Sequence, residues 1–245
     1  MAGRSKFAIG EQFRVLRTNL YHLHGNNESG RVTLFTSSIS QEGKSFISSN
    51  LAVTLAYASR KTIILSMDLR KPKIAGIFGL SDDFPGISDY LNNSSADLPA
   101  MIRPSGIPGL DLLGAGAVLP NPSELLETEK LDELVQFLKK RYDDIIIDTP
   151  PIHLVTDALI IARVAQATLY IVRQNFTHKN ELDFIKEINT GNRFNKFTIV
   201  FNGIKRDAGS YGYDYGNYNY NYYNAYTGKG KWSLGNSMKS FFKRF

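Results

Sequence analysis

The sequence predicts an α/β fold with a doubly wound, mostly parallel sheet, followed by a flexible C-terminal tail. Short apolar runs alternate with helix-like segments over about 190 residues, which is typical of strands covered on both faces. Two of these runs end in an aspartate, at Asp68 and Asp148. The composition then changes abruptly at Asp207, after which aliphatic side chains become rare. We therefore expect one α/β domain over residues 1–206 and a separate tail over residues 207–245.

The composition narrows the possible chemistry. The 245 residues are 42% hydrophobic, enough for one buried core plus an appendage. The chain has no cysteine, which excludes disulfides, thiolate zinc sites and thiol nucleophiles. No apolar run approaches the roughly 18–20 residues that span a bilayer, and no signal peptide follows Met1, so we expect a soluble chain. The net charge of +6 is modest, so where the charges cluster matters more than their sum.

The first predicted element is a helix over residues 10–24. Apolar residues recur there at spacings of three and four, at Phe13, Leu16, Leu20 and Leu23. Another face carries Glu11, Arg14 and Arg17, which are three residues apart. The spacing favours an ordinary ion pair on a solvated helix over the alternative, a charged surface for a neighbouring subunit.

A phosphate-binding loop follows the apolar run at residues 32–35. Residues 36–45 fit the pattern G-x-x-x-x-G-K-[ST], with Gly43, Lys44 and Ser45 in place and Ser38 where the first glycine is expected. In such a loop backbone N–H groups surround a phosphate chain, Lys44 supplies positive charge, and the Ser45 hydroxyl is placed to hold Mg²⁺. The strand before the loop and the helix after it make an ordinary polar turn the weaker interpretation.

Two aspartates follow buried strands further along the sequence, after this loop. Asp68 ends the run 63–67, and the carboxyl ends of parallel strands form the crevice where α/β sheets bind ligands. It is a candidate for binding the metal or for assisting the attacking group, with Arg70 and Lys71 as phosphate-binding cations; the alternative is a turn before Pro72. Asp148 ends the run 145–147 and is predicted to reach Mg²⁺, often through water. Together with the loop, these residues predict a nucleotide-binding sheet of the P-loop NTPase type.

The other elements complete the alternation. Ser123 is a predicted N-cap with acidic residues in the first turn after it. Residues 75–108 are harder to interpret, apart from a short helix at 87–91 and a turn at 106–109. The remaining predicted helices span 46–58, 125–142, 157–164 and 179–188, and the remaining strands span 110–113, 168–172 and 197–201.

The tail is rich in tyrosine. Eight of the 13 tyrosines lie close together, at Tyr211, Tyr213, Tyr215, Tyr218, Tyr220, Tyr222, Tyr223 and Tyr226. Such a segment is a low-complexity linker, a stacking surface for single-stranded nucleic acid, or a set of phosphate acceptors. No Lys or Arg lies between the first and last of these tyrosines, which argues against nucleic acid. Beyond them, basic residues mix with aromatic ones, as at anionic membrane surfaces: Lys229, Lys231, Trp232, Lys239, Phe241, Phe242, Lys243, Arg244 and Phe245.

These features together resemble the bacterial protein-tyrosine kinases that act with capsular and exopolysaccharide export systems. The resemblance covers essentially the whole chain. It rests on the Glu11, Arg14 and Arg17 helix, the loop 36–45, the motifs 68–72, 120–126 and 148–151, and the tyrosine cluster. Each motif alone is common among P-loop proteins. The tyrosine cluster joined to the Glu-Arg-Arg helix is much more specific.

The resemblance implies a kinase that uses ATP and Mg²⁺ to phosphorylate, in trans, the tail of a neighbouring subunit in a ring. Glu11, Arg14 and Arg17 then become a subunit contact. Further implied partners are a membrane co-polymerase or adaptor segment and a tyrosine phosphatase, with no nucleic acid, at the cytoplasmic face of the bacterial inner membrane. The implied catalytic residues are Lys44, Asp68 and Asp148, and the implied metal-binding residues are Ser45, Asp68 and Asp148. We expect the nucleotide to contact Ser38, Ser40, Gln41, Glu42, Gly43, Lys44, Ser45, Phe46, Arg70 and Asn202.

The chain departs from the family pattern at two places. Ser66 stands where the first aspartate of an Asp-x-Asp motif is usual, and Ser40 and Gln41 replace Pro-Gly in the loop. The first change keeps open a non-catalytic nucleotide-binding scaffold. A second alternative is a positioning or partition-type ATPase, but those proteins carry a lysine where this chain has Ile39.

Overall fold

The computed structural model describes residues 2–25, 29–93 and 97–204, with only the backbone for residues 2–8. Within this part of the chain a single seven-stranded sheet has the strand order β3-β4-β2-β5-β1-β6-β7. All neighbouring strands are parallel except the pair β3 and β4. The strands are β1 Arg31–Ser37, β2 Thr62–Ser66, β3 Arg103–Ile107, β4 Leu110–Leu113, β5 Asp144–Asp148, β6 Ala167–Arg173 and β7 Phe197–Asn202. The predicted fold class is therefore confirmed.

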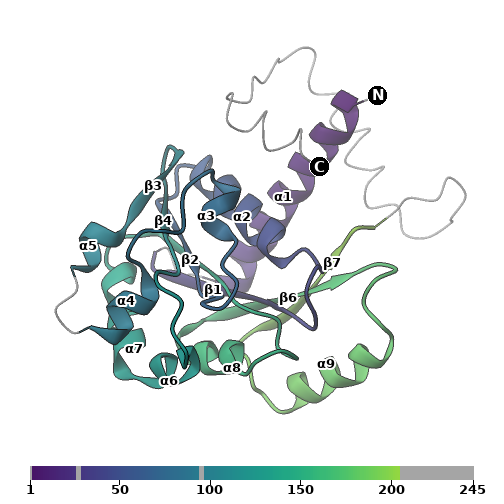
Figure 1. Cartoon of the computed structure of the whole chain (residues 1–245). Helices are drawn as coiled ribbons and strands as arrows, with labels where there is room; N and C mark the ends of the chain where they lie inside the picture. The colour runs from purple at the N-terminus through teal and green to yellow at the C-terminus, as the bar shows by residue number, and fades with distance from the viewer. Residues whose placement is uncertain (1, 26–28, 94–96, 205–245) are drawn as a thin grey trace, which may run out of the picture. The chain divides into compact units, whose positions relative to one another are not determined.

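Helices cover both faces of the sheet. Figure 1 shows α1 and α2 on one side of it and α7, α8 and α9 on the other. The helices are α1 Ala2–His24, α2 Lys44–Ala56, α3 Ile74–Ile77, α4 Ile87–Asn92, α5 Leu98–Met101, α6 Pro122–Glu127, α7 Glu129–Lys139, α8 Asp157–Ile161, the 3₁₀ helix η1 Ala162–Val164 and α9 Asn180–Thr190. Because the central strands are covered twice, every residue of β1, β2 and β5 is buried.

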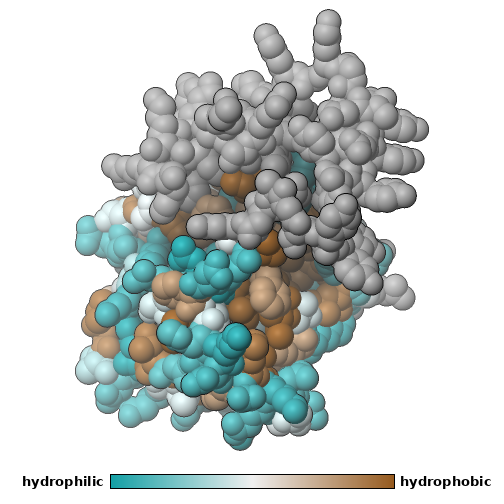
Figure 2. All heavy atoms as spheres, turned by 90° about the vertical axis from the view of Figure 1, so that its right-hand side faces the viewer, coloured by the Kyte–Doolittle hydropathy of each residue, from teal (hydrophilic) through white to brown (hydrophobic). Residues whose placement is uncertain are grey.

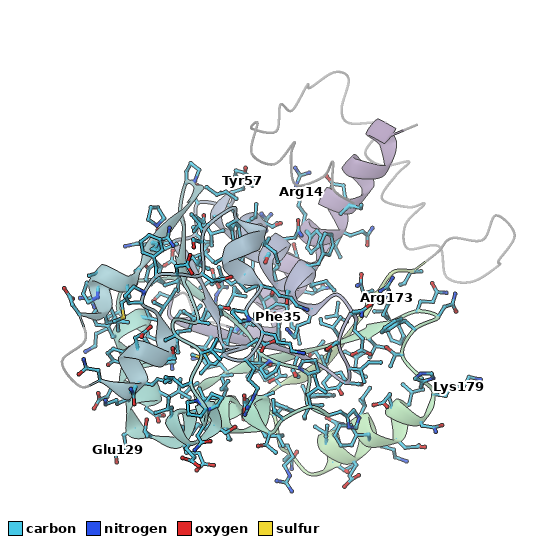
Figure 3. All side chains as sticks on the ribbon, viewed as in Figure 1. Arg14, Phe35, Tyr57, Glu129, Arg173 and Lys179 are labelled. Carbon is cyan, nitrogen blue, oxygen red and sulfur yellow. The ribbon has the colours of Figure 1, made fainter. Side chains whose placement is uncertain are left out.

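The core lies along the middle strands. Phe35 in β1 is completely buried at the centre of the molecule, whereas Glu129 and Lys179 point outward (Figure 3). The edge strand β7 is less protected, because Ile199 and Phe201 are 40% and 59% exposed. Figure 2, viewed from the side of β7 and α9, shows apolar side chains gathered among polar ones.

Several boundaries differ from the sequence-based expectation. The first helix begins at Ala2 rather than at residue 10, so Gly10 lies inside it; one glycine lowers helix stability by only about 1 kcal/mol. Strand β3 was not predicted, because Pro104 and Gly106 are rare in strands and are tolerated here at a sheet edge. The tail, predicted from Asp207, lies outside the described residues.

The predicted helix 125–142 is wrong, because the chain forms two helices there. Thr128 is extended and caps the start of α7, and its hydroxyl donates to the Leu125 carbonyl, 2.7 Å away. This bond competes with the helical backbone bond and separates α6 from α7. The predicted N-cap is also wrong: Asn121 caps α6, Pro122 occupies its first position, and Ser123 lies inside the helix.

Candidate active site

The phosphate loop joins β1 to α2 and is shaped by a glycine in a left-handed conformation. Gly43 has a φ of +94° and lies directly before Lys44, the first residue of α2. A Cβ atom at Gly43 would lie 2.1 Å from Nδ2 of Asn202, at the end of β7. That Nδ2 donates to the Glu42 carbonyl, 2.8 Å away. Asn202 therefore supports the loop through its backbone, and the loop requires glycine at position 43.

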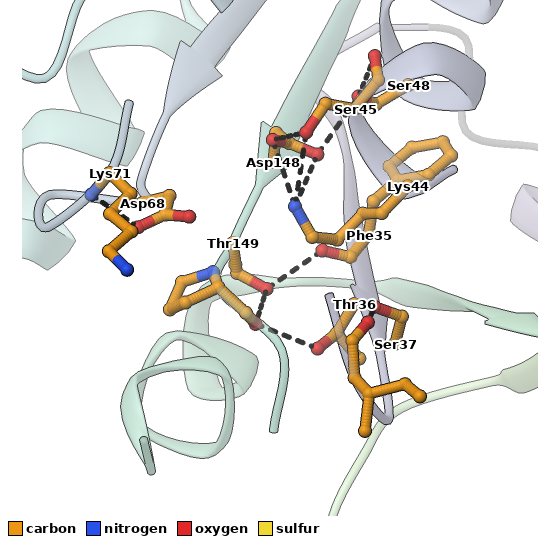
Figure 4. A network of polar contacts seen from close by, with 12 residues as sticks. Phe35, Thr36, Ser37, Lys44, Ser45, Ser48, Asp68, Lys71, Asp148 and Thr149 are labelled. Carbon is orange, nitrogen blue, oxygen red and sulfur yellow. Dashed lines mark hydrogen bonds and ion pairs between the residues drawn. The ribbon is translucent and has the colours of Figure 1, made fainter. Parts of the chain in front are cut away.

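A compact polar cluster forms where α2 begins. Lys44 Nζ lies 3.1 Å from both carboxylate oxygens of Asp148, at the end of β5. The hydroxyls of Ser45 and Ser48 donate to the same carboxylate over 2.8 and 3.1 Å. Figure 4 shows these four side chains in one hydrogen-bonded group. Strands β1 and β5 are neighbours in the sheet, which is why the loop after one strand meets the aspartate that ends the other.

Asp68 faces this cluster from the end of β2 (Figure 4). One of its oxygens accepts the Lys71 backbone N–H over 3.0 Å. Burial raises the pKa of Asp68, and the Asp148 carboxylate raises it further, while the Lys71 N–H and the Lys44 ammonium oppose the shift. A carboxylate with a raised pKa holds a proton more readily and is a better base than an exposed aspartate.

Ser66 occupies the last position of β2, directly opposite Asp148 in the register of β2 and β5. It is 1% exposed, and its buried hydroxyl has no hydrogen-bond partner in the described part of the chain. Of the two positions that carry aspartate in the usual motif, only Asp68 therefore brings a carboxylate to the cleft.

The loop and the strand ends line a cleft of about 200 Å³. Nine of the predicted site residues line it: Ser40, Gln41, Glu42, Gly43, Lys44, Ser45, Phe46, Asp68 and Arg70. Lys71, Lys73, Leu154 and Val155 also contribute to the wall, and only Lys71 among them was expected. Ser38 lies behind the loop, fully buried, with its hydroxyl 3.0 Å from that of Tyr170 in β6.

The carboxylate of Glu42 braces the phosphate loop. Although Glu42 contributes to the cleft wall, it is 1% exposed and accepts the Ile39 backbone N–H over 2.9 Å. Its other oxygen accepts the hydroxyl of Thr177, which in turn accepts the Arg173 backbone N–H. Arg173 also donates to the Gln41 carbonyl over 2.8 Å. Sequence reasoning missed Thr177 and Arg173, because they lie more than 130 residues from the loop in sequence.

The donor set fits a nucleotide with a divalent ion. The described residues contain no group of three or more His, Cys, Asp or Glu side chains that would hold a metal on its own. The cleft wall instead offers the carboxylate of Asp68 and the hydroxyl of Ser45, and that hydroxyl donates to a second carboxylate, Asp148. Mg²⁺ in phosphate-transferring sites commonly takes one or two carboxylates and completes its shell with phosphate oxygens and waters. The residues present therefore fit Mg²⁺ bound together with a nucleotide.

The charged residues of α1 make contacts within the chain. Arg14 forms an ion pair with Glu11 one turn earlier, as expected for a local pair. Arg17 Nη1 donates to the Thr54 carbonyl of α2 over 3.2 Å, so this arginine ties the two helices together. In the described residues, no helix is both long and apolar enough to cross a bilayer.

Comparison with known proteins identifies the family. No protein-family model matches the chain. The chain is 36% identical over 214 residues to CapB of Staphylococcus aureus, covering 87% of this chain and 92% of CapB. It is 33% identical over 208 residues to the tyrosine-protein kinase CpsD of Streptococcus agalactiae, covering 84% of this chain and 88% of CpsD.

Comparison with solved structures points to the same family. The kinase domain of the Escherichia coli tyrosine kinase ETK superimposes with a TM-score of 0.74 and 31% identity, covering 84% of this chain and 80% of that domain. The septum site-determining protein MinD of Pyrococcus horikoshii has a TM-score of 0.57 at 22% identity, covering 70% of this chain and 68% of MinD, which is a likeness of fold alone. The identity to CpsD over most of both sequences and the match to the ETK kinase domain show that this chain belongs to the family of bacterial tyrosine-protein kinases.

Proposed function

We propose that this bacterial tyrosine kinase uses ATP and Mg²⁺ to phosphorylate the tyrosines of its own tail, with the tail of one copy entering the cleft of another. The observation that carries the proposal is the hydrogen-bonded group of Lys44, Ser45 and Asp148 at the start of α2, with Asp68 facing it. Backbone N–H groups at a helix start favour a phosphate, and the two aspartates supply the oxygen ligands that Mg²⁺ prefers.

Each residue has a role that follows from its position. Lys44 binds the β and γ phosphate oxygens, and the backbone of residues 40–45 surrounds the phosphate chain. Ser45, Asp68 and Asp148 would hold Mg²⁺, either directly or through water. When bound, this ion offsets the phosphate charge and aligns the terminal phosphoryl group. The protein's contribution is therefore mainly positioning and charge stabilisation.

Asp68 is the proposed proton acceptor. A tyrosine hydroxyl ordinarily has a pKa near 10, so its attack on phosphorus is helped by a base. The carboxylate of Asp68 takes that proton as the tyrosine oxygen bonds to the γ phosphorus, while the bond from that phosphorus to the ADP oxygen breaks and ADP leaves. Arg70 and Lys71, which line the same cleft, stabilise the negative charge of the phosphoryl group during transfer.

The phosphate acceptors are tyrosines of the tail: Tyr211, Tyr213, Tyr215, Tyr218, Tyr220, Tyr222, Tyr223 and Tyr226. Each phosphotyrosine adds about −1.5 to −2 charges, so four would offset the formal +6 of the chain. In this proposal a ring of copies assembles through α1 at the cytoplasmic face of the inner membrane. A co-polymerase or adaptor segment anchors the ring, and a phosphatase resets the tail.

Ser66 supports one competing function, a scaffold that binds nucleotide without transferring phosphate. Its side chain leaves the cleft with one carboxylate fewer than the usual motif supplies. A positioning ATPase is disfavoured, because Ile39 occupies the loop position where those proteins carry a lysine.

One experiment separates the kinase from the scaffold. The wild-type chain and Lys44→Met are first dephosphorylated and then incubated with ATP and Mg²⁺. We expect the intact mass of the wild type to rise in steps of one phosphate, on residues 211–226, while Lys44→Met keeps its mass. A wild type that gains no phosphate at high concentration, with its membrane adaptor supplied, would support the scaffold instead.

A further inference from the structure

Arg70 is held at the cleft by two residues that the sequence did not connect with it. Its Nη2 donates to the Ser123 hydroxyl in α6, 2.9 Å away. The same hydroxyl donates to Oδ1 of Asp157, the first residue of α8, over 2.6 Å. Arg70 Nε lies 3.6 Å from the other oxygen of Asp157, which makes an ion pair. Three segments that are far apart in the sequence therefore meet at one guanidinium.

Asp157 is an unusual residue to bury. It is 0% exposed, and Oδ2, the oxygen nearest Arg70, accepts no hydrogen bond within the described residues. A buried carboxylate is stable only when a cation and hydrogen bonds compensate for the lost water. Arg70 supplies that cation, and Ser123 supplies the hydrogen bond. The position of the guanidinium is therefore coupled to a charge that cannot move into solvent.

Arg70 itself is not buried. Its side chain is 38% exposed and lines the cleft beside Asp68 and Lys71. The contacts above use Nε and Nη2, and among the described residues Nη1 has no partner. A guanidinium fixed through one edge presents its other N–H groups in a set direction, whereas a lysine ammonium on a flexible stem does not. This arrangement suits recognition of phosphate oxygens.

We propose that Asp157 and Ser123 are positioning residues, which aim the guanidinium of Arg70 at the phosphoryl group being transferred. This inference rests on the proposed function, because it assigns the target of Arg70 in that same cleft. Lys44 and the loop amides bind the nucleotide from the α2 side. Arg70 and Asp68 follow β2 instead. Loss of Asp157 should therefore slow transfer at saturating nucleotide and leave nucleotide affinity nearly unchanged.

Kinetics on full-length variants test the proposal. Asp157→Asn keeps the shape and the acceptor for Ser123 but removes the charge. We expect about a tenfold fall in the rate of tail phosphorylation at saturating ATP, with the Kd for ADP and Mg²⁺ changed less than about twofold. Ser123→Ala should act in the same direction. Asp132→Asn is the matched control, because Asp132 pairs with Arg163 on the surface, and it should keep the wild-type rate.

A double-mutant cycle shows whether Asp157 acts through Arg70. In an Arg70→Ala background, adding Asp157→Asn should slow transfer no further, since the group being aimed is already absent. An equal fall in both backgrounds would overturn the proposal, as would a tenfold weaker Kd or an Asp157→Asn rate equal to wild type. If the wild type itself transfers no phosphate, the proposed function fails, and that result is distinct from these.

A second measurement needs neither nucleotide nor activity. In ¹⁵N-labelled protein, the Nε–H signal of Arg70 is assigned by its loss in Arg70→Lys. We expect the chemical shift of this signal to change in Asp157→Asn, because the carboxylate 3.6 Å from Nε no longer carries a charge. A signal that stays at the same position in both proteins would show that Asp157 does not hold the guanidinium.

Discussion

Position 43 of the phosphate loop accommodates glycine but no larger residue without strain. Its φ of +94° disfavours any residue with a Cβ by about 1–2 kcal/mol, and that Cβ would also meet Asn202. We expect Gly43→Ala to weaken binding of a fluorescent ADP analogue by about tenfold or more, because the Lys44 backbone N–H would be displaced. Fluorescence titration measures this affinity directly.

Gly10→Ala is the control for that substitution. Gly10 lies inside α1 with open space around its Cβ position, so alanine there should leave nucleotide affinity unchanged and stabilise the chain by about 0.5–1 kcal/mol. If Gly43→Ala bound nucleotide as well as Gly10→Ala does, the loop would not depend on the conformation of Gly43.

Ser66 allows a test of the missing carboxylate. Ser66→Asp places a buried negative charge opposite the Asp148 carboxylate on the neighbouring strand, and these two like charges repel each other. Without divalent ions we expect the free energy of unfolding to fall by about 1–3 kcal/mol, and Mg²⁺ with ADP should restore most of it. Denaturant unfolding with EDTA and with Mg²⁺·ADP measures both values.

Ser66→Ala is the matched control. The Ser66 hydroxyl has no partner in the described residues, so its removal should change stability little in either condition. A loss of stability in Ser66→Asp that Mg²⁺·ADP does not reverse would mean that position 66 does not face the metal.

At the scale of elements, the end of α1 carries a buried histidine. His24 is 2% exposed, with Nε2 2.8 Å from the Thr33 hydroxyl of β1. Burial lowers its pKa to about 4; Arg31 and Lys196 act in the same direction, while Asp144 opposes them. Between the ordinary value of 6.5 and about 4, the unfolded chain therefore binds a proton that the folded chain does not.

The lowered pKa of His24 makes the folded chain more stable at higher pH. The contribution of His24 to stability is complete above pH 6.5 and declines as the pH falls towards 4, by up to about 1.4 kcal/mol per pH unit. We expect His24→Gln to flatten the fall in unfolding free energy over this window, as measured by urea unfolding at several pH values. His22→Gln, on the exposed side of the same helix, should follow the wild-type curve. Identical slopes for all three proteins would contradict the assignment.

What the sequence predicted, and what it missed, depends on how far apart the contacting residues lie. Gly43, Lys44 and Ser45 are adjacent, and the aspartate that ends each buried strand is visible from the pattern alone. The contact of Ser123 with Asp157 spans 34 residues, and that of Ser123 with Arg70 spans 53. Such contacts come from the packing of α6 against α8, which no local pattern specifies.

Some predicted helix boundaries were wrong for a related reason. The apolar spacing of a helix continues through Thr128, so periodicity predicts one helix across residues 125–142. The hydrogen bond from the Thr128 hydroxyl to the Leu125 carbonyl instead interrupts the helix at that point. The sequence predicted that the strands would be mostly parallel, but it did not predict their order in the sheet. The placement of β5 between β1 and β2, which brings Asp148 to Lys44, is a property of the assembled sheet.

At the scale of the whole molecule, the reach of the tail bears on how phosphate is transferred. Strand β7 ends at Asn202, which contacts the phosphate loop, and Tyr211 follows nine residues later. A segment of that length extends at most about 30 Å. Reach alone therefore does not exclude transfer within one chain. Transfer between copies depends instead on a subunit contact, for which α1 is the proposed surface.

Transfer between copies predicts an initial rate of tail phosphorylation, per chain, that rises with protein concentration. The charges on α1 allow the contact itself to be tested. In the double variant Glu11→Arg/Arg14→Glu the two residues can still pair one turn apart, so the stability of a single chain should match wild type within about 0.5 kcal/mol. Arg17 is left unchanged, because its bond to the Thr54 carbonyl joins α1 to α2.

The surface presented to a neighbour is reversed by this exchange, and like charges brought together across an interface cost several kcal/mol. We therefore expect the double variant to remain monomeric in light scattering at concentrations where the wild type assembles. Its rate of tail phosphorylation should fall about tenfold or more and lose its dependence on concentration. Nucleotide affinity should stay unchanged, since α1 does not line the cleft. An exchanged protein that assembles and phosphorylates its tail like the wild type would show that Glu11 and Arg14 only stabilise their own helix.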